Sequence, residues 1–145
     1  MLTPRRRIVV PLLAILTFWG CAEDGSLMPS PEGEIEPTLA SIQEHVFTPI
    51  CSACHVAGGT GALMLLDTEA NSYDHLVGVN APPASYYCRP WPRVSPGDPD
   101  NSCIVMKLED APGILGDPMP RPPLPRLDQE QIDAIRQWIA DGANP

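Results

Sequence analysis

The stretch Cys51-Ser52-Ala53-Cys54-His55 decides how the rest of this chain is interpreted. Two thiols three positions apart suit the two vinyl groups on one side of a porphyrin, and the next residue can bring its imidazole to the metal. The pattern therefore predicts one covalently attached haem c. In this interpretation Cys51 and Cys54 form the thioether bonds, and His55 is the first axial ligand of the iron.

The first twenty residues have the pattern of an export signal. Arg5, Arg6 and Arg7 precede an apolar run over 8–18, which is too short to cross a bilayer, and the run ends at Gly20-Cys21. We therefore predict a lipoprotein-type signal peptide over 1–20, with ordinary cleavage and soluble export as the alternative.

A small residue followed by cysteine resembles the lipobox of bacterial lipoproteins. We accordingly expect Cys21 to carry lipid and residues 21–37 to form a disordered tether, because this segment is rich in Glu, Gly, Ser and Pro. The expected location is the periplasmic side of the membrane, with a lipid anchor in the outer membrane and no transmembrane helix. Residues 38–145 would then form the folded domain.

The part of the chain from Cys21 onward is strongly acidic. Three of the nine basic residues precede Cys21 and all 18 acidic residues follow it, which leaves six basic residues and a formal net charge of −12. Such a surface argues against nucleic acid as a partner, because phosphates repel it. Docking on a basic partner protein remains compatible with this charge, and so does simple solubility.

Each of the five cysteines can be given a role. Cys21 is assigned to lipid and Cys51 and Cys54 to haem, so Cys88 and Cys103 are left. Because an exported protein folds in an oxidising compartment, we predict a disulfide between these two.

Hydrophobic periodicity predicts an all-α domain with proline-rich loops between short helices. The first helix begins at Thr38 and ends at Pro49, and a second covers 72–77. A third is capped by Asp100 or Asn101 and runs to Leu108, and the last extends from a capping box at Asp128 and Gln131 to Gly142. Between the first two helices, we expect a flexible loop over 56–61 and a segment over 63–67 that lines one edge of the haem.

Residues 81–101 contain six prolines together with two arginines, Arg89 and Arg93. A guanidinium matches the geometry of a carboxylate, so either arginine is a candidate partner for a haem propionate. Ordinary surface positions are an equally good interpretation of both.

Five residues are candidates for the second axial ligand: His45, Met64, His75, Met106 and Met119. Met119 is favoured because it lies in an irregular loop with proline on both sides, where no helix geometry restricts its approach. Met106 suits a core position within a helix better. Ligation by His and Met raises the reduction potential relative to two histidines.

Several of these features together resemble the monohaem class I cytochromes c, especially the exported cytochrome domains of bacterial lipoproteins. The resemblance covers roughly residues 38–144 and is carried by four motifs: Phe47-Thr48-Pro49-Ile50 before the haem motif, Val94-Ser95-Pro96-Gly97-Asp98-Pro99, Met119-Pro120, and Ile135-x-x-Trp138-Ile139-x-x-Gly142-Ala143. It implies terminal helices that pack across each other around one haem, with His55 and Met119 as axial ligands. In such proteins a backbone carbonyl fixes the proximal imidazole, often that of a proline, but here no proline follows His55 closely.

These features predict a carrier of single electrons that docks on a redox partner protein and is not itself an enzyme. Whether it serves as a subunit of an oxidoreductase is left open. A haem-based ligand binder or sensor with a displaceable sixth ligand is the alternative. A thiol–disulfide oxidoreductase or a zinc site is disfavoured, because a helix and no strand precedes Cys51.

Overall fold

The computed structural model describes residues 34–80, 88 and 90–145, all within one compact unit, Glu32–Pro145. The proposed signal peptide, Cys21 and Arg89 lie outside the described residues. Within the described part, the regular elements are helices, without a strand, and two isolated bridges join Val77 to Val94 and Asn80 to Pro92. The predicted all-α class is confirmed.

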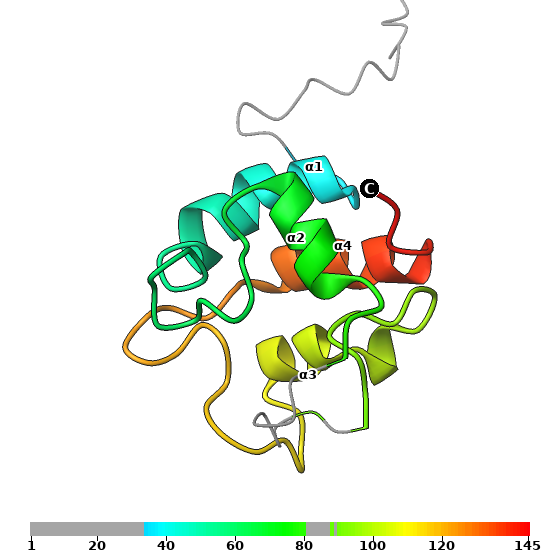
Figure 1. Ribbon diagram of the computed structural model, residues 1–145. Coiled ribbons are helices and arrows are strands. Elements are labelled where there is room, and N and C mark those ends of the chain that lie inside the picture. Colours follow the sequence, from blue (N-terminus) through cyan, green and yellow to red (C-terminus); the bar gives the residue numbers. More distant parts are fainter. Residues whose placement is uncertain (1–33, 81–87, 89) are drawn as a thin grey trace, which may run out of the picture. The chain divides into compact units, whose positions relative to one another are not determined.

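Six helical elements follow one another along the described chain (Figure 1): α1 (Leu39–Ile42), η1 (Gln43–Cys51, a π-helix), α2 (Glu69–Leu76), η3 (Pro99–Asn101, a 3₁₀ helix), α3 (Cys103–Glu109) and α4 (Gln129–Ala140). The last helix contacts α1 and α3, and α2 packs against α1 and η1. Besides the connection over 77–98, part of which lies outside the described residues, two long connections, over 52–68 and 110–127, leave this helical core.

The first helix starts as predicted, since the Thr38 hydroxyl accepts a hydrogen bond from the Ser41 amide. The prediction that Pro49 ends it is wrong, because the helix continues to Cys51 as a π-helix. Wider winding tolerates a proline better, and the Ser52 amide reaches back five residues to the Phe47 carbonyl at 2.8 Å. The helix therefore leads directly into the cysteine motif.

The third helix begins differently from the prediction. Neither Asp100 nor Asn101 caps α3, since both belong to the separate turn η3, which Asp98 caps. Ser102 occupies the cap position of α3, but its buried hydroxyl is used elsewhere: it accepts from the Ser95 amide and donates to the Asp98 carbonyl. The side chain thus stabilises the turn before the helix.

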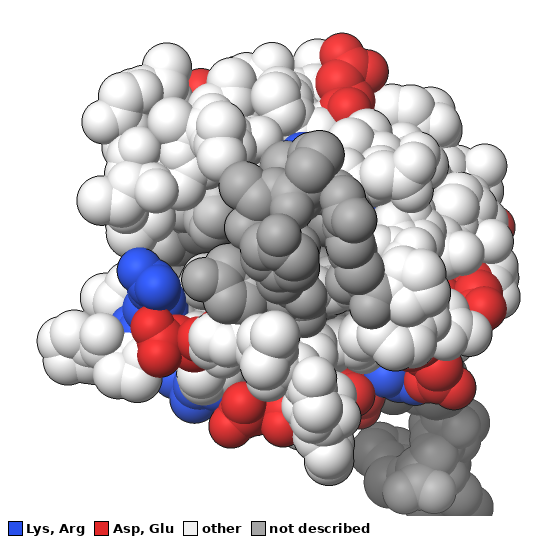
Figure 2. Space-filling model, turned by 60° about the horizontal axis from the view of Figure 1, so that its bottom comes forward, with Lys and Arg blue, Asp and Glu red and all other residues white. Residues whose placement is uncertain are grey.

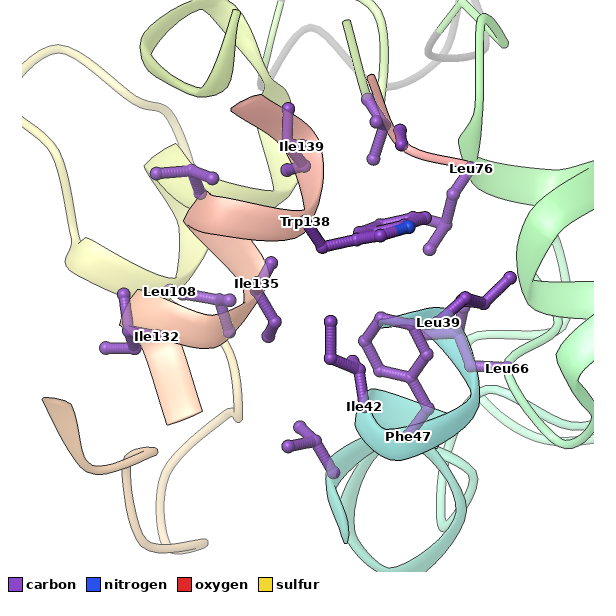
Figure 3. Close-up of a cluster of buried hydrophobic side chains, with 14 of the residues drawn as sticks. Leu39, Ile42, Phe47, Leu66, Leu76, Leu108, Ile132, Ile135, Trp138 and Ile139 are labelled. Carbon is purple, nitrogen blue, oxygen red and sulfur yellow. The ribbon is translucent and has the colours of Figure 1, made fainter. Parts of the chain in front are cut away.

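The last helix matches its prediction closely. Asp128 and Gln131 form the expected capping box, and the predicted apolar stripe is buried. Figure 3 shows Ile135 and Trp138 of this stripe on the side of Ile42 and Phe47, with Leu66 and Leu76 nearby. After Ala140 the chain turns at Gly142, whose φ of 103° favours glycine. One hydrophobic core therefore joins the two ends of the domain.

The described residues contain no helix long and apolar enough to cross a membrane. In Figure 2 the described side chains are mostly uncharged, with basic and acidic side chains next to one another along the lower edge. Ion pairs join Arg121 to Asp117, and Arg136 to both Asp100 and Glu109. The described basic side chains are thus partly neutralised by neighbours.

Candidate functional site

The cysteine motif forms a tight turn at the end of η1. Backbone amides of Cys54 and His55 both donate to the Cys51 carbonyl, at 3.2 and 2.9 Å. All three side chains are half-buried, and Cys51 packs against the hydrophobic core. The turn therefore brings two thiols and one imidazole together at the edge of the core.

The imidazole of His55 is oriented by the loop that follows it, residues 56–66, here named the histidine loop. Its Nδ1 atom lies 3.2 Å from the carbonyl oxygen of Gly61 and 3.1 Å from that of Met64. Because carbonyl oxygens only accept hydrogen bonds, Nδ1 carries the proton, and the lone pair of Nε2 is left to bind a metal. These two carbonyls are the acceptors that the sequence did not reveal.

Two glycines of the histidine loop serve close packing, which corrects the prediction of a flexible loop over 56–61. A Cβ atom on Gly61 would lie 2.5 Å from Nδ1 of His55, and one on Gly59 would lie 2.4 Å from the Cys54 carbonyl oxygen. Both distances are shorter than atoms tolerate. The Gly61 amide also donates to Cys54, and that of Leu66 to His55, each at 2.8 Å. The loop is therefore closed on the motif.

A buried glutamine fixes the far end of the histidine loop. Gln43 donates from its amide nitrogen to the Leu66 carbonyl at 3.0 Å and to the Thr48 hydroxyl at 2.9 Å. Its amide oxygen accepts from the Ser72 hydroxyl at 2.6 Å, and both side chains are buried. Because both the nitrogen and the oxygen of the Gln43 amide have hydrogen-bond partners, this network holds the end of the loop in one position.

Arg93 fixes the middle of the same loop. Its guanidinium donates to the Leu63 carbonyl at 3.0 Å and to the His75 carbonyl at 2.7 Å. The residue is 8% exposed, and burial lowers its pKa. The surface interpretation of Arg93 is therefore wrong. No carboxylate among the described residues forms an ion pair with it, so within this part of the chain the buried positive charge is met by the two carbonyl oxygens alone.

The segment that carries Arg93 is itself tied to neighbouring elements. The structure joins the sulfurs of Cys88 and Cys103, whose Cα atoms are 5.4 Å apart. Backbone amides of Cys103 and Ile104 donate to the carbonyls of Pro92 and Arg93, each at 3.0 Å. Cys88 is buried and Cys103, at the start of α3, is half-buried.

The two cysteines of the motif are free thiols in this structure. Burial, with a smaller contribution from Cys54, raises the pKa of Cys51 to about 12. A thiol with so high a pKa is protonated at neutral pH and is a poor nucleophile. This disfavours Cys51 as the attacking thiol of a thiol–disulfide exchange.

Met119 lies in the second long connection, residues 110–127, here named the methionine loop. Its side chain is half-buried and packs against the same core cluster as Cys51 and Met64. Met64 presents its own carbonyl to the His55 ring, which puts it on the histidine side. Lys107 of α3, which the sequence analysis overlooked, donates to this loop and accepts from the Met119 amide.

The other candidate ligands are engaged elsewhere. His45 donates through Nδ1 to the Ser41 carbonyl of its own helix at 2.8 Å. His75 is half-buried at the end of α2. Met106 lines a cavity of about 460 Å³ beside α3, together with Trp91 and Leu115. None of the motif residues lines this cavity, so its size has no bearing on the motif.

Among the described residues, no three His, Cys, Asp or Glu side chains gather around a common metal position. A haem needs no such cluster, because the porphyrin supplies four of the ligands. The donor set itself fits a haem: two thiols, an imidazole with Nε2 available, and thioethers on the same core. No protein family, no characterised protein and no solved structure matches the chain.

Proposed function

We propose that this protein is an electron-transfer protein with one haem c on Cys51 and Cys54 and a class I cytochrome c fold. The observation that supports this most is the orientation of His55, whose Nδ1 faces two carbonyl oxygens within 3.2 Å. An imidazole held in this way, directly after two thiols, is prepared to bind iron through Nε2. Met119 would supply the second axial ligand.

The residues of the chain would divide the work of holding the group. Cys51 and Cys54 fix its position covalently, and the histidine loop fixes the plane of the imidazole. Arg93 has further N–H groups beyond the two already engaged, and these suit a propionate. When bound, the haem would supply a one-electron iron couple for exchange with a redox partner protein.

Location forms part of the same proposal. Attachment of haem to the two thiols is compatible with an exported protein. Residues 1–20 would then act as a lipoprotein signal, and Cys21 would anchor the domain on the periplasmic side. Labelling cells with a radioactive fatty acid tests this directly. Label on the wild type and none on Cys21→Ser is expected, and equal label on both would contradict the anchor.

A second candidate function is a haem-based ligand binder. It is favoured by the exposure of the methionine loop, in which residues 121–126 are all exposed around a half-buried Met119. A ligand such as carbon monoxide would then displace the thioether. Rapid formation of a ferrous carbon monoxide complex at neutral pH would favour this function over electron transfer.

The haem itself is tested by expression with haem-maturation machinery. A pyridine haemochrome and an intact mass with one added haem are expected for the wild type, and neither for Cys51→Ala/Cys54→Ala. Wild-type protein of unmodified mass would end the proposal.

The second ligand is tested by Met119→Ala. This variant should keep its haem but lose the weak near-infrared band of methionine bound to ferric iron. Met106→Ala is the matched control, and it should keep the band. A band that survives in Met119→Ala would transfer the role to another methionine.

A further inference from the structure

Among the described residues of α3, Lys107 is the one that binds the middle of the methionine loop, residues 112–125. Its ammonium donates to the Leu115 carbonyl at 2.7 Å and to the Asp117 carbonyl at 3.1 Å. Its backbone carbonyl accepts from the Met119 amide at 2.9 Å. Three hydrogen bonds thus connect a single helical residue with a five-residue segment that ends at Met119.

Little else holds this part of the loop. Within the described chain, residues 112–125 make their other hydrogen bonds and ion pairs inside the loop or to Ala111: Ile114 to Ala111, Arg121 to Asp117, and Leu124 to Arg121. The next attachment to α3 is the hydrogen bond from Arg126 to the Leu108 carbonyl. The path from Ala111 to Arg126 is therefore determined mainly by Lys107 and by the packing of half-buried Met119 and buried Pro120.

The bonded atoms surround the methionine closely. Pro118 and Pro120 have fixed φ angles, so the chain on either side of Met119 has few conformations. Lys107 binds the Asp117 carbonyl and the Met119 amide. These two hydrogen bonds determine the position from which the Met119 side chain leaves the backbone. A half-buried ammonium that donates to two carbonyls makes stronger bonds than a neutral donor would.

We propose that Lys107 is a positioning residue for the sixth iron ligand, and that its side chain sets how readily Met119 is displaced. This inference rests on the proposed function, since it requires a haem with Met119 on one face. Lys107 itself touches neither iron nor substrate. Its side chain shifts the equilibrium between a loop that presents the thioether and one that has moved away.

The test compares three variants of the haem-loaded protein. Lys107→Leu removes the N–H donors and keeps an apolar side chain. Lys107→Arg keeps a positive charge and N–H donors for both carbonyls. Arg121→Leu removes an equal charge from the methionine loop itself. Among the described residues, the ion pair of Arg121 lies inside the loop, with Asp117, and its side chain is 62% exposed. The readouts are the near-infrared methionine–iron band and the rate at which the ferrous protein binds carbon monoxide.

Lys107→Leu should weaken the band and raise the rate of carbon monoxide binding on the order of tenfold, because bonds to a charged donor are lost. Lys107→Arg and Arg121→Leu should both stay within about twofold of the wild type, as expected for a retained donor and for an exposed ion pair. If Lys107→Leu behaves like Arg121→Leu, the inference is overturned.

Two further measurements separate this inference from the proposed function. Wild-type protein without haem, or without the methionine band, overturns both. Haem with a normal band in the wild type and in Lys107→Leu overturns the role of Lys107 alone. Circular dichroism of each variant verifies the helices, and a folded Lys107→Leu variant that has lost the band supports the inference.

Discussion

The histidine loop and the methionine loop are held by opposite means. The histidine loop folds back on its own first residues, and buried Gln43 and Arg93 bind its carbonyls from outside. The methionine loop is exposed along most of its length, and a half-exposed lysine is its main attachment. A fixed imidazole and a less constrained thioether would give the two faces of one haem different tolerance of change.

The largest expected effect comes from adding one methyl group to the histidine loop. In Gly61→Ala the new Cβ would lie 2.5 Å from Nδ1 of His55, so the imidazole must leave its two carbonyl partners. We expect a loss of about 3 kcal/mol in the free energy of unfolding, since overpacking a constrained site is costly. Urea denaturation measures the loss, and the haem-to-protein ratio should fall with it.

Gly113→Ala in the methionine loop is the matched control for this substitution. Gly113 has a φ of 88° and no atom within 4 Å of an added Cβ, so only backbone strain of about 1 kcal/mol is expected. The contrast between the loops fails if the two alanines destabilise the protein equally.

A smaller effect is expected when the outer support of the histidine loop is removed. Gln43→Leu leaves the Leu66 carbonyl and the Ser72 hydroxyl buried without their partner, at a cost of about 2 kcal/mol. Chemical denaturation of Gln43→Leu and of Ser72→Ala would measure this. Ser72→Ala breaks one bond of the network and should cost less, and the reverse order would mean that the amide does not hold the loop.

The smallest effect is expected for the ion pair inside the methionine loop. Arg121→Leu should change the free energy of unfolding by no more than about 0.5 kcal/mol, because both side chains are more than half exposed. The same denaturation experiment measures it, with and without added salt. A loss above about 1 kcal/mol would show that the methionine loop is more firmly held than its contacts indicate.

Local patterns predicted the helices well where the relevant contacts are close in sequence. The capping box at Asp128 and the stripe that includes Trp138 use neighbours three or four residues apart, and both are present. The end of the first helix was predicted wrongly, because π winding accommodates Pro49. The cap of the third helix was also predicted wrongly, because Asp100 and Asn101 belong to a separate turn that Asp98 caps.

The sequence predicted which residues form the candidate site, but it did not predict the residues that hold them in place. Cys51, Cys54 and His55 follow from their spacing, but the carbonyls that face His55 depend on how the loop folds back. Gln43 could have been noticed in the sequence, because it is a polar residue within the apolar stripe of the first helix. The burial of Arg93 arises from contacts with residues up to 30 positions away, which no local pattern contains.

The closure of the histidine loop has a consequence for the order of assembly. The backbone hydrogen bonds that close it on the motif join residues at most eleven positions apart, from Gly61 to Cys54 and from Leu66 to His55. Loops of this length close in well under a microsecond, whereas the contacts of α4 with α1 require nearly the whole domain. A nascent chain would thus present both thiols and the imidazole in their final arrangement early, and a modifying enzyme could recognise this short segment before the C-terminal helix arrives.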